Sequence, residues 1–376
     1  MQTSRPVKIL AIVTGLFFFT SNLSGSFLPL YFRDLGLGVP QIAEILLFTF
    51  MVLGLLPLLL LKAVKNFERI ITVGIFTTML FFVILIFVKD PIILGLTRGL
   101  SLATFWPSFN LLQFRLTESK QRARFIGLFS IILPSLASIF GPATGGFIIQ
   151  NFGFASLFIT SMILYLIAFI LSTQVHFESE VHRFAIPRSG IFIVFFLTFI
   201  IIGLIENYWL AYPFFLYGIS GTALNMGLVL AASAVLISAI TFSVSWLSDV
   251  RRIRVEFAVV GTALNVVWYV LVTFSRSMNE IVALSLLSGV ASAFQISWFA
   301  HYADSFDKEY YASILVMMET GLMAGRIMNL LPTVTYISEA LYPNYFMLLG
   351  AIALCLIPLY ALSKRVSPNV SEREHA

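Results

Sequence analysis

The chain is a series of long apolar stretches separated by short clusters of charged residues, glycine or proline. An apolar helix needs about 20 residues to cross roughly 30 Å of hydrocarbon. Each stretch is continuously apolar rather than alternating over about ten residues, so the pattern predicts membrane-spanning helices and not the strands of a barrel. Twelve spans are expected, at residues 8–32, 40–62, 68–89, 91–115, 122–150, 153–173, 189–217, 220–247, 254–274, 279–303, 309–337 and 341–362.

The composition agrees with this pattern. Of the 376 residues, 59% are hydrophobic and only 11% are charged, whereas soluble domains have about 25% charged residues. The chain therefore lacks the polar residues needed to cover a soluble surface. A soluble enzyme, a nucleic-acid binder and a disordered chain are excluded, and an all-α protein whose main partner is the lipid bilayer is predicted. A single cysteine, Cys355, excludes an intramolecular disulfide and a cysteine-rich metal site.

The distribution of basic residues predicts the orientation, because cytoplasmic loops carry an excess of Lys and Arg. With the first residue inside, 18 of the 23 basic residues fall on the cytoplasmic side. Three, Arg33, Lys89 and Arg276, fall outside, and Arg98 and Arg326 fall within the membrane. We therefore expect a multi-pass protein of the plasma (inner) membrane with both termini in the cytoplasm and an even number of spans.

The longest polar loop follows the sixth span, where a linker between two six-helix halves would lie. This gives an N-terminal bundle at 1–173, a central cytoplasmic loop at 174–188 and a C-terminal bundle with a short tail at 189–376. The loop contains two His and two Glu residues, but no ligand spacing fits a closed metal site, and a solvated loop is expected.

A weak internal repeat supports the two halves, since offsets between matching positions grow slowly along the chain. The offset is 184 near the start of each half and 190 near the end. The matched pairs are Asn22 with Glu206, Lys62 with Asp249, Gly74 with Gly261, Gly99 with Gly289, and Pro142 with Pro332. The alternative is chance alignment of apolar sequence.

Local motifs add a family resemblance. The fifth span ends in GPATGG, the eighth is followed by SWLSDVRRIR, and the fourth contains Arg98 in TRGLSLA. With the twelve spans and the repeat, these resemble the major facilitator superfamily. GPATGG is similar to the tail of the antiporter motif of twelve-span proton-coupled exporters, although Leu128 and Ala137 stand where glycines are usual. The resemblance implies two pseudo-symmetric six-helix bundles, with spans one, four, seven and ten around a central cavity.

Two of these motifs are candidates for gating. A proline within a helix removes a backbone hydrogen bond, and nearby glycines allow close helix packing, which suits a hinge or seal; ordinary small-residue packing is the alternative. An aspartate after span eight can accept from a neighbouring arginine or cap the next helix, so it could latch the cytoplasmic side; topogenic charge is the alternative. The candidate gating residues are Gly141, Pro142, Gly145, Gly146, Asp249, Arg251 and Arg252.

Four ionisable residues inside the spans are candidates for proton coupling, namely Arg98, Glu206, Glu319 and Arg326. Each costs roughly 2.5–3.5 kcal/mol on insertion scales, so a functional role or a partner is expected. Glu206 could pair with Arg98 across the two halves or with Arg326 inside the second half. An apolar pocket raises the pKa of a carboxyl group and suits it to proton exchange near neutral pH. A fixed salt bridge between helices is the alternative.

Aromatic and amide side chains near these charges are candidates for substrate binding. They are Asn22, Trp106, Asn110, Gln113, Trp209, Gln295 and Trp298. Such a lining binds amphipathic, aromatic or lipid-like molecules, and sugars by stacking. Lipid contact or packing is the alternative for any one of them.

Together these features favour a secondary active transporter that works by alternating access, with proton-coupled efflux of a small amphipathic or drug-like compound as the expected activity. A sugar or metabolite symporter or facilitative carrier is the alternative, and a receptor or assembly factor on the same scaffold is a third. The sequence has no GxxxxGK[ST] loop, so no ATP-driven pump is expected, and no enzyme activity, cofactor or nucleic-acid partner. A monomer driven by the proton gradient is expected.

Overall fold

The computed structural model describes residues 5–64, 66–116, 133–174, 184–251 and 253–366, and every regular element in these ranges is helical. The first half contains α1 (Arg5–Ser24), η1 (Gly25–Phe27), α2 (Leu28–Asp34), α3 (Val39–Ala63), η2 (Phe67–Arg69), α4 (Ile70–Phe87), α5 (Pro91–Leu116) and α7 (Leu133–Ser172). The second half contains α8 (Gly190–Ile205), α9 (Ala211–Ser220), α10 (Ala223–Arg251), α11 (Arg254–Phe274), α12 (Met278–Asp304), η4 (Lys308–Tyr310), α13 (Tyr311–Ser338), α14 (Tyr342–Ala353) and α15 (Leu356–Val366).

These elements form the twelve spans that the apolar pattern predicts. The first span is α1, η1 and α2 in succession, the seventh is α8 and α9, and the twelfth is α14 and α15. α7 combines spans five and six, which meet at Gly153, where φ is +78° and the helix is interrupted. The first part of the predicted fifth span lies outside the described residues.

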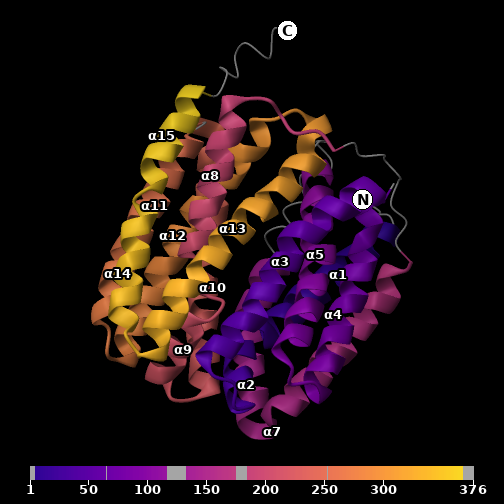
Figure 1. Ribbon diagram of the computed structural model, residues 1–376, viewed down its shortest axis with the longest axis vertical. Helices are drawn as coiled ribbons and strands as arrows, with labels where there is room; N and C mark the ends of the chain where they lie inside the picture. Colours follow the sequence, from indigo (N-terminus) through magenta and orange to yellow (C-terminus); the bar gives the residue numbers. More distant parts are fainter. Residues whose placement is uncertain (1–4, 65, 117–132, 175–183, 252, 367–376) are drawn as a thin grey trace.

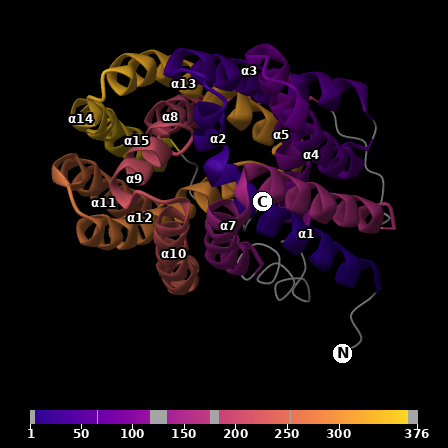
Figure 2. The ribbon, with the colours of Figure 1, turned by 90° about the horizontal axis from the view of Figure 1, so that it is seen from below.

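The helices form two pseudo-symmetric bundles of six spans each, and Figure 1 shows the two halves side by side. In the first, α1 packs on α7 and α3 packs on α5; in the second, α8 packs on α13 and α12 packs on both α10 and α11. Two long seams join the bundles, α7 against α10 and α3 against α13, and both are seen in end view in Figure 2. The start of α1 and the end of α15 lie at the same end of the molecule, called here the terminal side.

Glycines at helix crossings reveal the repeat in three dimensions. Gly74 lets α4 approach the backbone of α5, and Gly261 lets α11 approach the backbone of α12. Gly99 brings α5 against α3, and Gly289 brings α12 against α10. These are equivalent crossings in the two halves, because small residues allow helix backbones to come close in a membrane. The aligned glycines of the sequence repeat therefore allow equivalent helix crossings in the two bundles.

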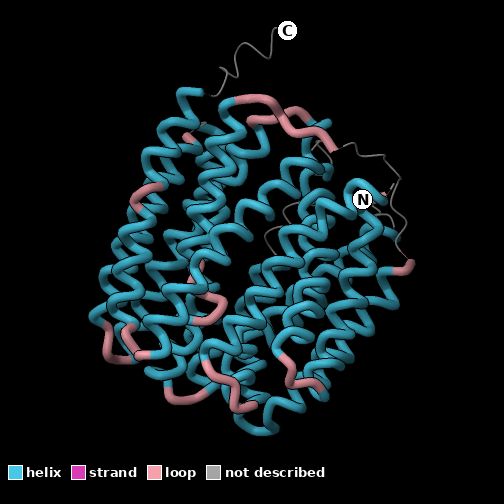
Figure 3. The backbone as a smooth tube through the Cα atoms, viewed as in Figure 1, coloured by secondary structure: helices cyan, strands magenta, loops and turns pink. Residues whose placement is uncertain are grey.

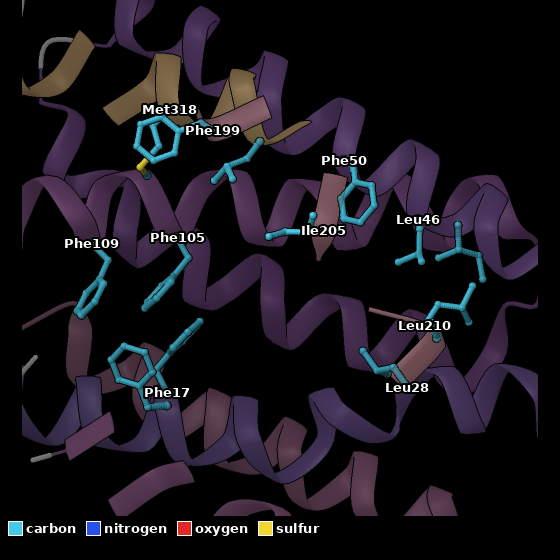
Figure 4. Packing of buried hydrophobic residues seen from close by; sticks show 14 of the residues in the cluster. Phe17, Leu28, Leu46, Phe50, Phe105, Phe109, Phe199, Ile205, Leu210 and Met318 are labelled. Atoms are coloured by element: carbon cyan, nitrogen blue, oxygen red, sulfur yellow. The ribbon is translucent and has the colours of Figure 1, made fainter. Parts of the chain in front are cut away.

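Aromatic side chains fill the interior of the bundles. Phe17 of α1 stacks on Phe105 of α5 with ring centroids 3.3 Å apart, and Phe109 stacks on Phe105 one turn along (Figure 4). Many large apolar side chains are instead exposed on the outer surface, including Leu59, Phe87 and Ile193. A surface of this kind belongs in lipid, so the chain is an integral, multi-pass membrane protein.

Most loops lie at the two ends of the bundles (Figure 3). The segment between α8 and α9 differs, since residues 206–210 are not helical although they interrupt a membrane span. Non-helical backbone at membrane depth is tolerated only where protein or a water-filled cavity satisfies its polar groups. This break holds Glu206 at its first position and Trp209 near its end.

Candidate functional site

A cavity of about 410 Å³ lies between the two bundles. Its size falls within the range of small-molecule sites, about 300–1,000 Å³. The first half contributes residues from α1, α2, α3 and α5, and the second half contributes residues from the break, α9, α10 and α13. The lining residues with polar or aromatic side chains are Ser21, Asn22, Ser26, Phe32, Thr49, Arg98, Trp106, Tyr208, Trp209, Tyr212, Glu319 and Arg326.

Arg326 is held by two carboxyl groups beside this cavity. Its Nε donates to Oε2 of Glu206 over 2.7 Å, and its Nη2 donates to Oε1 of the same carboxylate over 3.0 Å. Its Nη1 donates to Oε2 of Glu319 over a longer 3.4 Å. The arginine side chain is 7% exposed, and the two glutamates are 12% and 7% exposed. One guanidinium therefore compensates two buried carboxyl groups, and Glu206 is held more closely.

Trp209 completes the hydrogen bonding of Glu206 and caps the ion pair. Its indole Nε1 donates to Oε2 of Glu206 over 2.7 Å. The Arg326 guanidinium lies 5.6 Å from the Trp209 ring centroid and 5.7 Å from that of Phe50, so cation–π attraction adds to the ion pair. Phe50 belongs to α3, so this aromatic cap joins the two bundles.

Side chains satisfy the carbonyl groups that the helix break releases. The hydroxyl of Tyr269 donates to the Ile205 carbonyl over 2.6 Å, and Nδ2 of Asn329 donates to the Glu206 carbonyl over 2.7 Å. The Tyr345 hydroxyl donates in turn to Oδ1 of Asn329 over 3.1 Å. Spans nine, eleven and twelve thus hold the break in place, which fixes the position of Glu206 against Arg326.

The other intramembrane arginine has a different environment. Arg98 of α5 lines the same cavity, but it forms no ion pair with a residue that the structure describes. Its guanidinium lies 5.1 Å from the centroid of the Phe81 ring. Of the two pairings expected for Glu206, the one with Arg326 is present and the one with Arg98 is absent. The reason is that the break in span seven turns the carboxylate toward α13.

The structure brings together only some of the predicted lining residues. Asn22, Trp106 and Trp209 line the cavity, whereas Asn110 and Gln295 do not. Trp298 is also away from it, buried between the rings of Phe195 and Tyr360. For Gln113, the structure describes the backbone in α5 but not the side chain. In this structure α12 turns Gln295 and Trp298 toward α11 and α8, so they lie away from this cavity, and their assignment to substrate binding stays a prediction.

A family model described as Major Facilitator Superfamily matches residues 10–183, which comprise most of the first bundle. The second bundle repeats its architecture. Over residues 10–183 the chain is similar to the major facilitator superfamily.

Two sequence relatives each match part of this chain. An uncharacterized protein in the sodM 3′ region of Geobacillus stearothermophilus is 29% identical over 164 residues, which are 40% of this chain and 73% of the relative. The Methylenomycin A resistance protein of Streptomyces coelicolor is 32% identical over 102 residues, which are 26% of this chain and 21% of the relative.

Solved transporters share the fold over nearly the whole length. The nucleoside transporter NupG superposes with a TM-score of 0.73 and 12% identity, covering 96% of this chain and all of that one. The human organic anion transporter MFSD10 (TETRAN) superposes with a TM-score of 0.66 and 14% identity, covering 95% of this chain and all of that one. At these identities the likeness concerns the fold alone.

The glycine-rich GPATGG motif lies where three helices meet, α7, α1 and α10. Gly141 and Gly145 face the backbone of α1, so they pack within the first bundle. Gly146 instead faces the backbone of α10 near Ala223, and the carbonyl of Pro142 lies against Gly227 of α10. The motif thus forms part of the seam between the bundles.

The second candidate gate falls largely outside what the structure describes. Arg252 is not described, and the side chain of Asp249 is not described either. Arg251 is the last residue of α10 and is exposed. The latch suggested for Asp249 stays a prediction.

Several residues of the site were not predicted from the sequence. Asn329 and Tyr345 hold the broken helix, and Tyr208 and Tyr212 line the cavity. Asn329 could have been found, because a third polar side chain three residues after Arg326 is unusual in an apolar span. The tyrosines carry no such signal, since tyrosine is common at membrane interfaces as well.

Proposed function

We propose that this chain is a secondary active transporter of the major facilitator superfamily that exports a small amphipathic or drug-like compound in exchange for protons, by alternating access of the two bundles. The observation that carries the proposal is the cluster of two carboxyl groups around Arg326 at the wall of an aromatic cavity. The GPATGG motif and the match to a resistance protein favour export.

The proton step would occur at the carboxyl groups. One guanidinium balances one carboxylate, so a proton on the second carboxyl group makes the cluster neutral. Glu319 is the better acceptor, because it lines the cavity and receives one long hydrogen bond from Arg326. Glu206 receives three shorter bonds and keeps Arg326 oriented. Arg98 would act in this scheme as the second fixed positive charge of the cavity.

The substrate would bind between the bundles. Trp106 of the first half and Trp209 of the second present aromatic surface to the cavity, and Asn22 provides an amide. Apolar walls with a few polar groups suit amphipathic molecules. The same amide and aromatic groups also favour, as the second candidate, a facilitative or symporting carrier for a polar metabolite.

Transport in liposomes tests the proposal. The purified protein is reconstituted, a pH gradient is imposed, and a panel of lipophilic compounds and sugars is offered as cargo while internal pH is recorded. We expect a proton flux that depends on a lipophilic cargo. Glu319→Gln should reduce this flux by tenfold or more, because an amide cannot exchange the proton, and Glu206→Gln should reduce it as well.

Glu339→Gln is the matched control, since Glu339 is exposed just after the end of α13 and should leave the flux unchanged. If both cavity variants retain the wild-type flux, the proton assignment is wrong. Cargo movement without proton movement would support the facilitative carrier instead.

We also propose that the terminal side faces the cytoplasm of a plasma membrane and that the protein acts as a monomer. The proposal rests on the excess of basic residues on that side, 18 of 23. A reporter at the C-terminus that fluoresces only in the cytoplasm should be bright. Light scattering of the detergent-purified protein should give the mass of one chain.

A further inference from the structure

Among the described residues, the cavity contains one positive charge that lacks an ion-pair partner. Arg326 shares its charge with Glu206 and Glu319, while Arg98 forms no ion pair within the described ranges. The Arg98 guanidinium lies over the Phe81 ring and interacts electrostatically with the Tyr165 phenol, and neither group is a carboxylate. Cation–π attraction offsets part of the desolvation cost of a guanidinium but does not neutralise it.

The Arg98 guanidinium stays positively charged in this position, because arginine does not lose its proton in proteins. Its fork of N–H donors matches a carboxylate, and such charge-assisted pairs are about twice as strong as neutral hydrogen bonds. Since Arg98 lines the cavity, its missing partner can be supplied by a molecule that enters it.

The surroundings of Arg98 suggest the rest of that molecule. Leu102 and Trp106 follow at intervals of four residues on the same face of α5, and both line the cavity. Trp209 and Tyr212 line it from the second half. A carboxylate at Arg98 would therefore continue into an apolar space with aromatic walls.

We propose that the substrate is an amphipathic monoanion, an aromatic carboxylate whose charged group binds Arg98 and whose ring lies beside Trp106 and Trp209. The inference rests on the proposed function, since it names the substrate class of the same cavity. It gives Arg98 a role in binding the substrate rather than in holding the protein together.

Binding of three probes of nearly equal shape tests the proposal without any ion gradient. The probes are 2-naphthaleneacetate, the neutral 2-naphthaleneacetamide and the cation 2-(2-naphthyl)ethylamine, titrated onto the detergent-purified full chain by tryptophan fluorescence. We expect the carboxylate to bind about 10 to 100 times more tightly than the amide, the range for a charge-assisted hydrogen-bonded pair, and the amine to bind most weakly.

Variants of Arg98 locate the effect. Arg98→Gln should remove the preference for the carboxylate while the affinity for the amide stays within about threefold, so amide binding also shows that the variant is folded. Arg98→Lys should keep part of the preference, because an ammonium lacks the bidentate geometry. Arg276→Gln is the matched control: Arg276 is exposed and its Nη1 donates to the Thr273 and Ser275 carbonyls, away from the cavity, so the preference should be unchanged.

The proposal is overturned if the amide or the amine binds as tightly as the carboxylate to the wild-type protein, if Arg98→Gln retains the preference, or if none of the probes binds at millimolar concentration. These outcomes are separate from those of the liposome experiment. Carboxylate preference without proton flux would support the substrate class and refute the coupling. Cargo-dependent proton flux without carboxylate preference would support the coupling and refute the substrate class.

Discussion

At the scale of single residues, the second bundle places one arginine among several competing acceptors. Arg326 contacts two carboxyl groups and two aromatic rings, and the backbone carbonyl of Glu206 is held separately by Asn329. Removing one partner of a buried pair costs more than the pair contributes, because the remaining group is left desolvated. The ion pairs of Arg326 therefore depend on uncharged side chains such as Asn329, which hold the charged residues in place.

Asn329→Ala tests this dependence. The change leaves the Glu206 carbonyl without its side-chain donor and removes the acceptor of the Tyr345 hydroxyl, which keeps the hydrogen bond that it accepts from Thr333. A buried unsatisfied group costs about 1–3 kcal/mol, so the variant should unfold at a lower temperature than the wild type. The measurement is thermal unfolding in detergent followed by tryptophan fluorescence. Thr335→Ala, an exposed position on the same helix, is the control, and equal midpoints for the two variants would contradict the role given to Asn329.

At the scale of elements, close helix crossings set the geometry of the site. Gly203 of α8 faces the backbone of α13, and Gly325 of α13 faces the backbone of α8 at Ile200. These contacts lie within a few residues of Glu206 and Arg326, on the same two helices. The distance between the carboxylate and the guanidinium therefore follows from how closely α8 and α13 can pack.

Gly325→Ala should separate these helices. The added Cβ would overlap the Ile200 carbonyl oxygen and lie 2.7 Å from the Leu204 nitrogen. Overpacking of this kind costs about 1–3 kcal/mol, so we expect a lower unfolding temperature together with a reduced cargo-dependent proton flux. Gly218→Ala in α9 is the control, because a Cβ there meets nothing within 4 Å. A Gly325→Ala protein as stable and active as the control would refute the argument.

The spans could be predicted from the sequence because each needs a fixed length of apolar residues. The two halves could be predicted because the sequence repeats weakly. The thickness of the hydrocarbon layer fixes the span length, and Gly74 with Gly261 shows the duplication directly. The partners within the site do not follow, because the rotation of each helix is set by packing. Trp106 and Trp298 are both tryptophans in even-numbered spans, yet one faces the cavity and the other is buried against Phe195. The helix break after Ile205 could not be predicted either, because α8 ends there without a proline.

At the scale of the whole molecule, the two bundles meet again on the side opposite to the termini. The Arg33 guanidinium of α2 lies 5.7 Å from the Phe214 ring centroid and 5.6 Å from that of Tyr217, both in α9. If the bundles alternate, this contact between halves must open once in each cycle.

A reversible link across this contact should stop transport. In a Cys355→Ser background, cysteines replace Arg33 and Tyr217, and a bis-methanethiosulfonate linker joins them. We expect the linked protein to lose nearly all cargo-dependent flux and to recover it when the linker is reduced. The two single-cysteine variants, treated with the same reagent, control for the substitutions themselves. Full flux in completely linked protein would show that the two tips need not separate.

The irregular parts of spans one and seven have a mechanical consequence. The short helix η1 at Gly25–Phe27 and the break at residues 206–210 occupy matching places in the two halves, and each joins a long helix to a short tip, α2 or α9. Helices bend where the hydrogen-bond ladder is interrupted, so these joints set the angle between each long helix and its tip. Gly25, Ser26, Tyr208 and Trp209 line the cavity from the joints. A molecule that fills the cavity therefore contacts both joints at once.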